Sequence, residues 1–219
     1  MGRIIAIEGL DGCGKQTQSA LLRKALSDAG HKVTSVDFPR YGKKSALLCE
    51  AYLRGEMASC ADEVSAYAAS TFFAVDRYVS YLAEWRDAYE KSDFLVADRY
   101  VTSNAIYQCC KLPREEWEGF VTWLYDFEFV KLGLPKPDKV FYLSMPVDTS
   151  EALLSSRYAG DESKRDIHER DYSYLRRSQD AAEWCSEWLG WERIECVHGG
   201  ELRAIEEIHK DMLTKIGVQ

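Results

Sequence analysis

A glycine-rich segment near the start of the chain constrains the fold more than any other feature. Residues 9–15 are Gly-Leu-Asp-Gly-Cys-Gly-Lys; they follow the apolar run 4–7 and precede the helix-like stretch 16–22. A strand, a glycine-rich turn and a helix in this order are the context of a phosphate-binding P-loop. Glycines let backbone N–H groups converge on phosphate oxygens, and the start of the helix adds its positive dipole end. A tight turn with a surface lysine is the alternative, and the strand–turn–helix context favours phosphate binding over it.

Each position of this P-loop, residues 9–17, has an expected partner. We expect contacts with ATP from Gly9, Gly12, Cys13, Gly14, Lys15, Gln16 and Thr17. Lys15 supplies a point charge for the outer phosphates. Gln16 replaces the hydroxyl residue that normally binds Mg²⁺, and its amide oxygen is an acceptable hard ligand for that ion. Cys13 lies beside Lys15 and a helix N-terminus, which favour a reactive thiolate, or else it is a small residue that fills the turn.

Length, charge and cysteine content restrict the class of protein. A chain of 219 residues is long enough for a full core, and we expect one domain over residues 1–219. The formal net charge of -8 argues against nucleic acid as a partner, because such binding needs a basic surface. The seven cysteines show no metal-binding spacing, and we find neither a signal peptide nor an apolar run that could cross a bilayer. These features indicate a cytoplasmic protein without a membrane partner.

Strand-like and helix-like segments alternate along the chain. Strands are expected at 3–8, 32–38, 94–97, 139–143 and 193–197, and helices at 15–29, 44–54, 63–90, 101–111, 114–131, 148–156, 167–189 and 202–216. This alternation predicts an α/β fold with a parallel five-stranded sheet and helices on both faces. The charged, glycine-containing stretch 157–166 is either a solvated loop or a lid that closes over a nucleotide. With a P-loop upstream, we favour the lid.

Two polar residues follow the third predicted strand. Asp98 and Arg99 lie at the carboxyl end of a buried strand, where ligands bind in open α/β sheets. Asp98 can hold Mg²⁺, and Arg99 can clamp a phosphate through two hydrogen bonds. Asp98 can also cap the helix that follows. Both roles are compatible.

Two pairs of side chains share helix faces. Phe73 and Arg77 are four residues apart, and Asn104 and Tyr107 are three apart. Phe73 and Arg77 can stack on a base and hydrogen-bond its edge, although aromatic residues in apolar helices usually belong to the core. Asn104 has a donor and an acceptor, which suit the imide edge of a pyrimidine. Neither pair identifies a function by itself.

Taken together in chain order, these segments resemble the thymidylate kinase family. The resemblance is carried by the P-loop, by Phe-Pro-Arg-Tyr at 38–41, by residues 73–77, 98–107 and 132–138, and by the lid, and it covers nearly the whole chain. It implies a three-layer P-loop kinase fold with a short lid. It also implies a cytosolic homodimer that uses Mg²⁺ and transfers the γ-phosphoryl group of ATP to dTMP, giving dTDP for dTTP synthesis.

The same resemblance implies individual roles. Catalysis would fall to Lys15, Arg99, Asp11 and Arg157, and Arg157 would also contact ATP; Lys164 or Arg165 would reach over from the lid. The acceptor would contact Asp11, Phe38, Arg40, Phe73, Arg77, Arg99, Ser103, Asn104 and Tyr107. Phe73 would stack on thymine, Arg77 would donate to its O4 atom, and Tyr107 would occupy the space of a ribose 2′-hydroxyl. Because positions 10–13 contain no basic residue, cationic assistance is expected from the lid.

Other functions remain as alternatives. A regulatory switch of the small-GTPase class would need an N-K-x-D motif, which the sequence lacks. Another nucleoside monophosphate or deoxynucleoside kinase is a closer alternative, and Arg99 argues for an acceptor that already carries a phosphate. A non-catalytic nucleotide-binding protein is the third. The four histidines lie in no motif and are expected to be surface or structural residues: His31, His168, His198 and His209.

Overall fold

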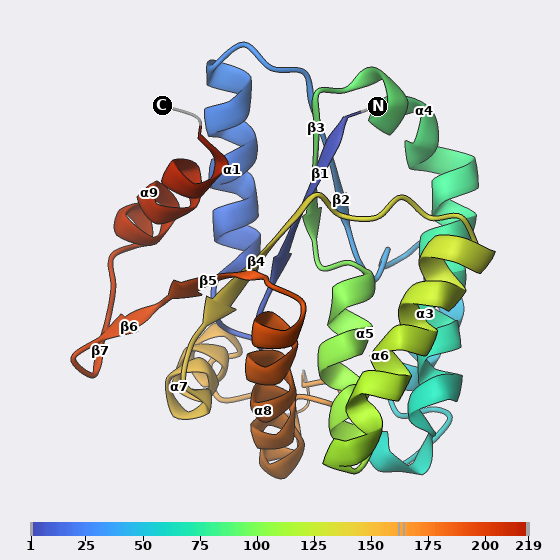
Figure 1. Cartoon of the computed structure of the whole chain (residues 1–219). Coiled ribbons are helices and arrows are strands. Elements are labelled where there is room, and N and C mark those ends of the chain that lie inside the picture. Colours follow the sequence, from blue (N-terminus) through green and yellow to red (C-terminus); the bar gives the residue numbers. More distant parts are fainter. Residues whose placement is uncertain (1, 162, 164, 218–219) are drawn as a thin grey trace.

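The centre of the molecule is a parallel sheet of five strands. In the computed structural model, which describes residues 2–161, 163 and 165–217, the strand order is β2-β3-β1-β4-β5 (Figure 1). The strands are β1 (Arg3–Glu8), β2 (Val33–Asp37), β3 (Phe94–Asp98), β4 (Lys139–Ser144) and β5 (Glu192–Glu195). Every neighbouring pair in this sheet is parallel. The α/β fold with five parallel strands is therefore confirmed.

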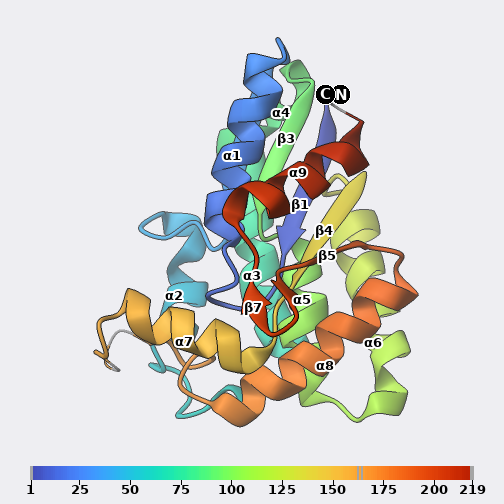
Figure 2. The same ribbon diagram turned by 90° about the vertical axis from the view of Figure 1, so that its left-hand side faces the viewer.

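Helices cover both faces of this sheet. They are α1 (Lys15–Asp28), α2 (Leu47–Leu53), α3 (Ala66–Ser80), α4 (Arg86–Lys91), α5 (Val101–Tyr107), α6 (Trp117–Tyr125), α7 (Val147–Arg157), α8 (Tyr172–Trp188) and α9 (Ile205–Ile216). Helices α1 and α9 lie on one side of the sheet, and α3 to α6 lie on the other (Figure 1). Helix α7 lies beyond the carboxyl ends of the strands, and Figure 2 shows the same arrangement from the side.

Alternating strand residues supply the two layers of core. In β1, Ile5 and Ile7 pack in the cluster that includes Leu22 of α1 and Met212 of α9. The alternate residues of β1, including Ile4, pack in the cluster formed with α5, α6 and α8. This is the two-sided burial expected of a central strand in a parallel sheet. In the part of the chain that the structure describes, we find no helix with the length and apolar character needed to span a membrane.

Several predicted boundaries are wrong. The helix expected at 63–90 is α3 and α4 separated by a π-helical turn, Tyr81–Trp85. The helix expected at 167–189 begins only at Tyr172, where the Asp171 side chain accepts hydrogen bonds from two backbone N–H groups. Leu202, expected to start the last helix, instead lies in β7 (Glu201–Leu202), which pairs with β6 (Val197–His198) in a small antiparallel hairpin. Capping by Asp171 explains the later start, because a cap satisfies N–H groups that the first turn leaves unpaired.

Candidate active site

A cavity of about 1010 Å³ lies at the carboxyl ends of the strands. It brings together predicted site residues from the P-loop and five later segments: Asp11, Gly12, Gly14, Lys15, Gln16, Thr17, Phe38, Phe73, Arg77, Asp98, Arg99, Ser103, Asn104, Tyr107 and Arg157. Three predicted residues are not part of its wall. Gly9 and Cys13 belong to the P-loop but are buried on its inner side. The Arg40 guanidinium is bound to Glu84 (2.6 Å) and is not part of the wall.

Two P-loop glycines occupy positions where a side chain has no room. Gly9 has φ +147°, and a Cβ there would lie 2.6 Å from the Cys13 sulfur. Gly12 has φ +88°, and a Cβ there would lie 2.5 Å from the carbonyl oxygen of Ser150 in α7. These positive angles are accessible mainly to glycine. The sequence pattern therefore has a steric cause, and the loop packs directly against α7.

Lys15 is folded back onto its own loop. Its Nζ donates to the carbonyl oxygens of Gly9 (2.9 Å) and Leu10 (2.7 Å) and lies 3.7 Å from the Asp11 carboxylate. The side chain is only 7% exposed. An ammonium group has three donors and no acceptor, so it binds to oxygens such as these. They hold the Lys15 charge at the cavity wall, from which the side chain can turn toward a phosphate.

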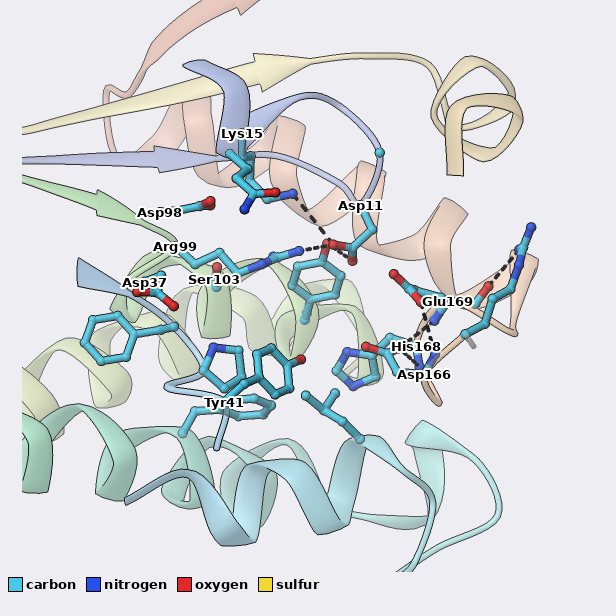
Figure 3. Close-up of a pocket in the computed structure, with 18 of the residues that line it drawn as sticks. Asp11, Lys15, Asp37, Tyr41, Asp98, Arg99, Ser103, Asp166, His168 and Glu169 are labelled. Carbon is cyan, nitrogen blue, oxygen red and sulfur yellow. Dashed lines mark hydrogen bonds and ion pairs between the residues drawn. The ribbon is translucent and has the colours of Figure 1, made fainter. Parts of the chain in front are cut away.

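Asp11 and Arg99 form the ion pair at the middle of the cavity (Figure 3). The Tyr107 hydroxyl donates to the other Asp11 oxygen at 2.9 Å. Burial opposes ionisation of Asp11, but the charges of Arg99 and Lys15 and the Tyr107 hydrogen bond outweigh it and hold the pKa of Asp11 below its usual value. Arg99 has φ +66°, an uncommon conformation for a residue with a side chain. The turn after β3 thus directs a permanent cation into the cavity.

A second ion pair lies deeper, among α3, α5 and the turn after α6. Arg77 donates through Nε and Nη2 to both oxygens of Glu128, at 2.6 Å each, and the two side chains are 2% and 0% exposed. Asn104 donates to Glu128 at 3.3 Å and to the Ser70 carbonyl at 3.2 Å. Arg77 and Asn104, predicted from separate helices, therefore share one partner. Glu128 was not predicted, because it is one of three acids in the aromatic-rich stretch 117–131 and no local pattern distinguishes it.

Glu8, also missed, holds the start of α5 in place. Its fully buried carboxylate accepts hydrogen bonds from the backbone N–H of Tyr100 (2.9 Å) and from the hydroxyls of Thr102 (2.6 Å) and Ser103 (2.6 Å). Burial raises the pKa of Glu8, although these hydrogen bonds partly offset that effect. The contact fixes β1 relative to the segment that carries Arg99. An acid directly before the first P-loop glycine was the available signal.

The segment between α7 and α8 closes one side of the cavity. Arg157, at the end of α7, has its guanidinium 5.8 Å from the centre of the Tyr158 ring. Arg165 is bound to Glu151 (2.6 Å) and to Ser155 (2.8 Å), so it is held at the base of this segment. Lys164 lies outside the described residues. Of the cations expected from the lid, Arg157 is the one that the structure places at the cavity wall without a carboxylate partner among the described residues.

Further polar residues line the cavity and were missed, among them Gln108, Asp166, His168 and Glu169. Both polar side-chain atoms of Gln108 are buried without a hydrogen-bond partner, and buried polar atoms of this kind usually have one. His168, expected to be a surface or structural residue, is 5% exposed, stacks on Tyr107 and lines the cavity. The last three lie in the segment predicted to be partly lid and partly helix, where no motif marked them.

The cavity also contains both residues expected to bind Mg²⁺, Asp98 and Gln16, together with Asp37, which was not predicted. Asp98 and Asp37 are adjacent in the β2–β3 register, and both line the wall, as does Gln16. Burial raises the pKa of Asp98, whereas the charges of Lys15 and Arg99 act to lower it. Within the described ranges no group of three or more His, Cys, Asp or Glu residues can hold a metal by itself. Mg²⁺ usually binds one or two carboxylates plus substrate phosphates and water, so this sparse set of oxygen ligands fits Mg²⁺.

Cys13 had two interpretations, a reactive thiolate or a small residue that fills the turn. Cys13 is 3% exposed, and burial raises the pKa of its thiol, although Lys15 and Arg99 act in the opposite direction. Its sulfur fills the space beneath Gly9. The alternative interpretation, a small residue that packs the turn, is the correct one.

Comparison with known proteins gives a consistent result. The family model described as thymidylate kinase matches residues 7–198. Thymidylate kinase from Mycobacterium tuberculosis is 35% identical over 195 residues, which cover 85% of this chain and 89% of the relative. Thymidylate kinase from Plasmodium falciparum is 28% identical over 224 residues, covering 100% of this chain and 92% of the relative. A solved structure of thymidylate kinase from Candida albicans superposes with a TM-score of 0.69 at 20% identity, covering 99% of this chain and 91% of that chain.

Proposed function

The chain belongs to the thymidylate kinase family, and we propose that its cavity binds ATP and dTMP side by side and transfers the γ-phosphoryl group to dTMP, giving dTDP. The observation that carries this proposal is that Lys15 and Arg99 both pair with Asp11 in one cavity. One cation serves the donor phosphates, and the other serves a phosphate on the acceptor. The enzyme is an ATP-dependent kinase.

The donor side consists of the P-loop and the end of α7. We infer that Lys15 exchanges the Gly9 and Leu10 carbonyls for the outer phosphates of ATP when the nucleotide binds. The loop N–H groups and the start of α1 complete the anion site. Arg157 then approaches the transferring phosphoryl group as this segment closes as a lid. When bound, Mg²⁺ neutralises phosphate charge; Asp98, Asp37 and Gln16 are the residues that would hold it, directly or through water.

The acceptor side reads the base and the sugar. Arg77 has N–H groups beyond the three that the structure pairs with Glu128 and the Tyr100 carbonyl, so it can donate to a carbonyl of thymine. We infer that Asn104 and Gln108 meet the base edge and that Phe73 covers its face. Tyr107 and Asp11 meet the sugar, and Arg99 holds the acceptor phosphate. A phosphate oxygen is already a nucleophile, so catalysis needs positioning and charge neutralisation rather than a general base.

We also propose that two copies associate through the outer face of α3. Val75, Val79 and Leu82 follow one another at helical spacing across α3 and the adjoining turn, and they are 42%, 43% and 48% exposed. An apolar stripe on a helix can pair with the same stripe of a second copy across a twofold axis. We expect analytical ultracentrifugation to show a dimer that becomes a monomer on Val79→Glu; a monomeric parent protein would contradict the proposed dimer.

The seven cysteines are all free, which supports a reducing location such as the cytoplasm.

A coupled assay with a panel of acceptors tests the activity. With ATP and Mg²⁺ we expect rapid ADP formation with dTMP and dTDP as the product. Thymidine, which lacks the phosphate that Arg99 would hold, is expected to be a poor acceptor. Preparations of Lys15→Met made in parallel control for contaminating kinases. Phosphorylation of thymidine without phosphorylation of dTMP would show that the chain belongs with the deoxynucleoside kinases in its activity.

A further inference from the structure

Behind the acceptor wall, three side chains form a continuous hydrogen-bonded chain. Lys111 Nζ donates to the Tyr52 hydroxyl at 2.9 Å, and that hydroxyl lies 3.1 Å from Nε2 of His168. Tyr52 belongs to α2, Lys111 to the turn after α5, and His168 to the segment before α8. His168 lines the cavity, whereas Lys111 and Tyr52 are outside its wall. The chain therefore connects three separate elements to the acceptor site.

The charge on Lys111 sets the direction of these hydrogen bonds. An ammonium group can only donate, so the Tyr52 oxygen accepts from Lys111. The Tyr52 hydroxyl then donates to Nε2 of His168 rather than to the more distant Ala61 carbonyl at 3.5 Å. Burial and the nearby Lys111 charge lower the pKa of His168 to about 3, so the imidazole is neutral and can accept. We assign its proton to Nδ1.

Stacked rings connect the hydrogen-bonded chain of Lys111, Tyr52 and His168 to the acceptor site. The His168 ring lies 5.5 Å from the Tyr107 ring at an interplanar angle of 10°, and it is 4.9 Å from the Tyr174 ring on another side. Tyr107 is hydrogen-bonded to Asp11, so the face of His168 continues the wall that would surround the acceptor sugar (Figure 3). The backbone nearby is fixed as well, because the N–H of Ile167 donates to the Leu53 carbonyl at 2.9 Å. A change in the His168 orientation would therefore alter this wall.

A purely structural role does not account for Lys111. Its two hydrogen-bond acceptors, Tyr52 and the Val64 carbonyl, are neutral oxygens. Burial lowers the pKa of Lys111 to about 8, which means that the folded protein keeps the charge at a cost in stability. Apolar residues of similar volume often replace buried charges with equal or greater stability. A buried cation that costs stability, and whose hydrogen bonds lead to the cavity, indicates a role in function.

We propose that Lys111 and Tyr52 are positioning residues for the acceptor nucleotide: they fix the orientation of the His168 imidazole against Tyr107 and thereby shape the wall around its sugar. The proposal rests on the proposed dTMP kinase activity. Lys111 and Tyr52 would then affect acceptor binding without touching the substrate. ATP binding, on the opposite side of the cavity, would not depend on them.

A double-mutant cycle tests this dependence. Tyr52→Phe removes one hydroxyl and is expected to raise the KM for dTMP about threefold to tenfold, the value of one neutral hydrogen bond, while the KM for ATP stays unchanged. His168→Phe keeps a ring but removes the acceptor atom, so adding Tyr52→Phe to it should have no further effect. Dissociation constants for dTMP from calorimetry provide a second readout that does not depend on turnover. Tyr142→Phe, which removes a hydroxyl bonded to Glu183 outside the cavity, is the matched control.

Lys111→Met separates positioning from packing. Because burial penalises the charge, we expect this variant to melt no lower than the parent at pH 7 while its KM for dTMP rises. If the effects of Tyr52→Phe and His168→Phe multiply in the double variant, or if the KM for ATP rises in parallel, the proposal is wrong. A parent protein that does not phosphorylate dTMP would instead overturn the proposed function.

Discussion

The two sides of the cavity are built in different ways. The donor side is local in sequence: Lys15 is held by the carbonyls of Gly9 and Leu10, and the loop conformation follows from the glycines themselves. The acceptor side is assembled from distant segments, since Arg77 is held by Glu128, 51 residues away. Glu8 likewise binds Ser103, 95 residues away. Backbone oxygens therefore hold the donor cation Lys15 at hydrogen-bond distance, with the Asp11 carboxylate farther away at 3.7 Å, whereas carboxylates bind the acceptor cations Arg77 and Arg99 directly.

This difference suggests a division of labour. A lysine held by carbonyl oxygens can leave them for phosphates, because those oxygens can hydrogen-bond to water or to other donors. An arginine bound by two hydrogen bonds to a buried carboxylate is expected to stay in place, because separation would leave two buried charges unpaired. The donor side is thus suited to movement as the nucleotide binds and the lid closes. The acceptor side is suited to rigid recognition of a base.

The largest effect is expected at the moving edge of the donor side. Arg157→Ala removes a cation that we place at the transferring phosphoryl group, and such a group contributes about a thousandfold or more to turnover. We expect kcat to fall by about this factor in steady-state assays, with the Kd for dTMP nearly unchanged. Arg176→Ala, at an exposed arginine of α8 bonded to Tyr172, is the control and should keep full activity. Near-normal kcat in Arg157→Ala would assign the cationic role to another residue.

The next effect tests the rigidity of the acceptor side. Glu128→Gln keeps the volume of the side chain but leaves the Arg77 charge buried without its counter-charge. Breaking a buried pair in this way typically costs about 3–5 kcal/mol, which urea unfolding would measure. The KM for dTMP should rise as well, because Arg77 and Asn104 both depend on Glu128.

Asp126→Asn is the matched control for this variant. Asp126 starts the same π-helical turn and pairs with Lys131 at 3.4 Å, but the two side chains are 50% and 66% exposed. An exposed pair of this kind contributes less than about 1 kcal/mol. Equal losses in the Glu128→Gln and Asp126→Asn proteins would show that the buried pair has no special role in the acceptor site.

The same division explains how far the sequence could predict the site. The P-loop and the parallel sheet were predictable because glycine sterics, apolar strands and helix periodicity act over a few residues. Phe73, Arg77, Asn104 and Tyr107 were found through a family resemblance rather than from their own chemistry. Glu128 was not found, because its role depends on a partner 51 residues away that no local pattern indicates.

The segment before α8 was the least predictable part. The apolar periodicity of the sequence predicted a helix from residue 167. In the structure Asp171 caps α8, and the Asp166 carboxylate holds the preceding turn. The turn places His168 against Tyr107. Side-chain capping decided the conformation here, and the packing of α2 and α5 against the turn decided which residues face the cavity. Neither effect has a signature at the level of periodicity.

The smallest expected effect concerns Asp166, whose carboxylate lies on the acceptor side and, among the described residues, has no arginine partner like that of Glu128. Burial, the neighbouring Glu169 and Asp11 raise the pKa of Asp166 from 3.8 to about 7. A carboxyl whose pKa is higher in the folded state favours folding below its unfolded pKa and loses that contribution as the pH rises through the folded value. The parent protein should therefore lose stability relative to Asp166→Asn between about pH 4 and pH 7.

The difference in unfolding free energy between the parent and Asp166→Asn changes by at most about 1.4 kcal/mol per pH unit. Between pH 5 and pH 7.5 we expect it to change by at least about 1 kcal/mol. Urea unfolding of both proteins without nucleotide measures it. Because the Asp166 carboxylate also accepts hydrogen bonds from the backbone N–H groups of His168 (2.8 Å) and Glu169 (2.9 Å), the variant loses a constant amount at every pH. Only the change of this free-energy difference with pH reports the titration of Asp166. If the difference does not change with pH, Asp166 is ionised as easily in the folded chain as in the unfolded one. The acceptor side would then tolerate an unpaired carboxylate as readily as a paired one, and the contrast with the donor side would rest on the Arg77–Glu128 pair alone.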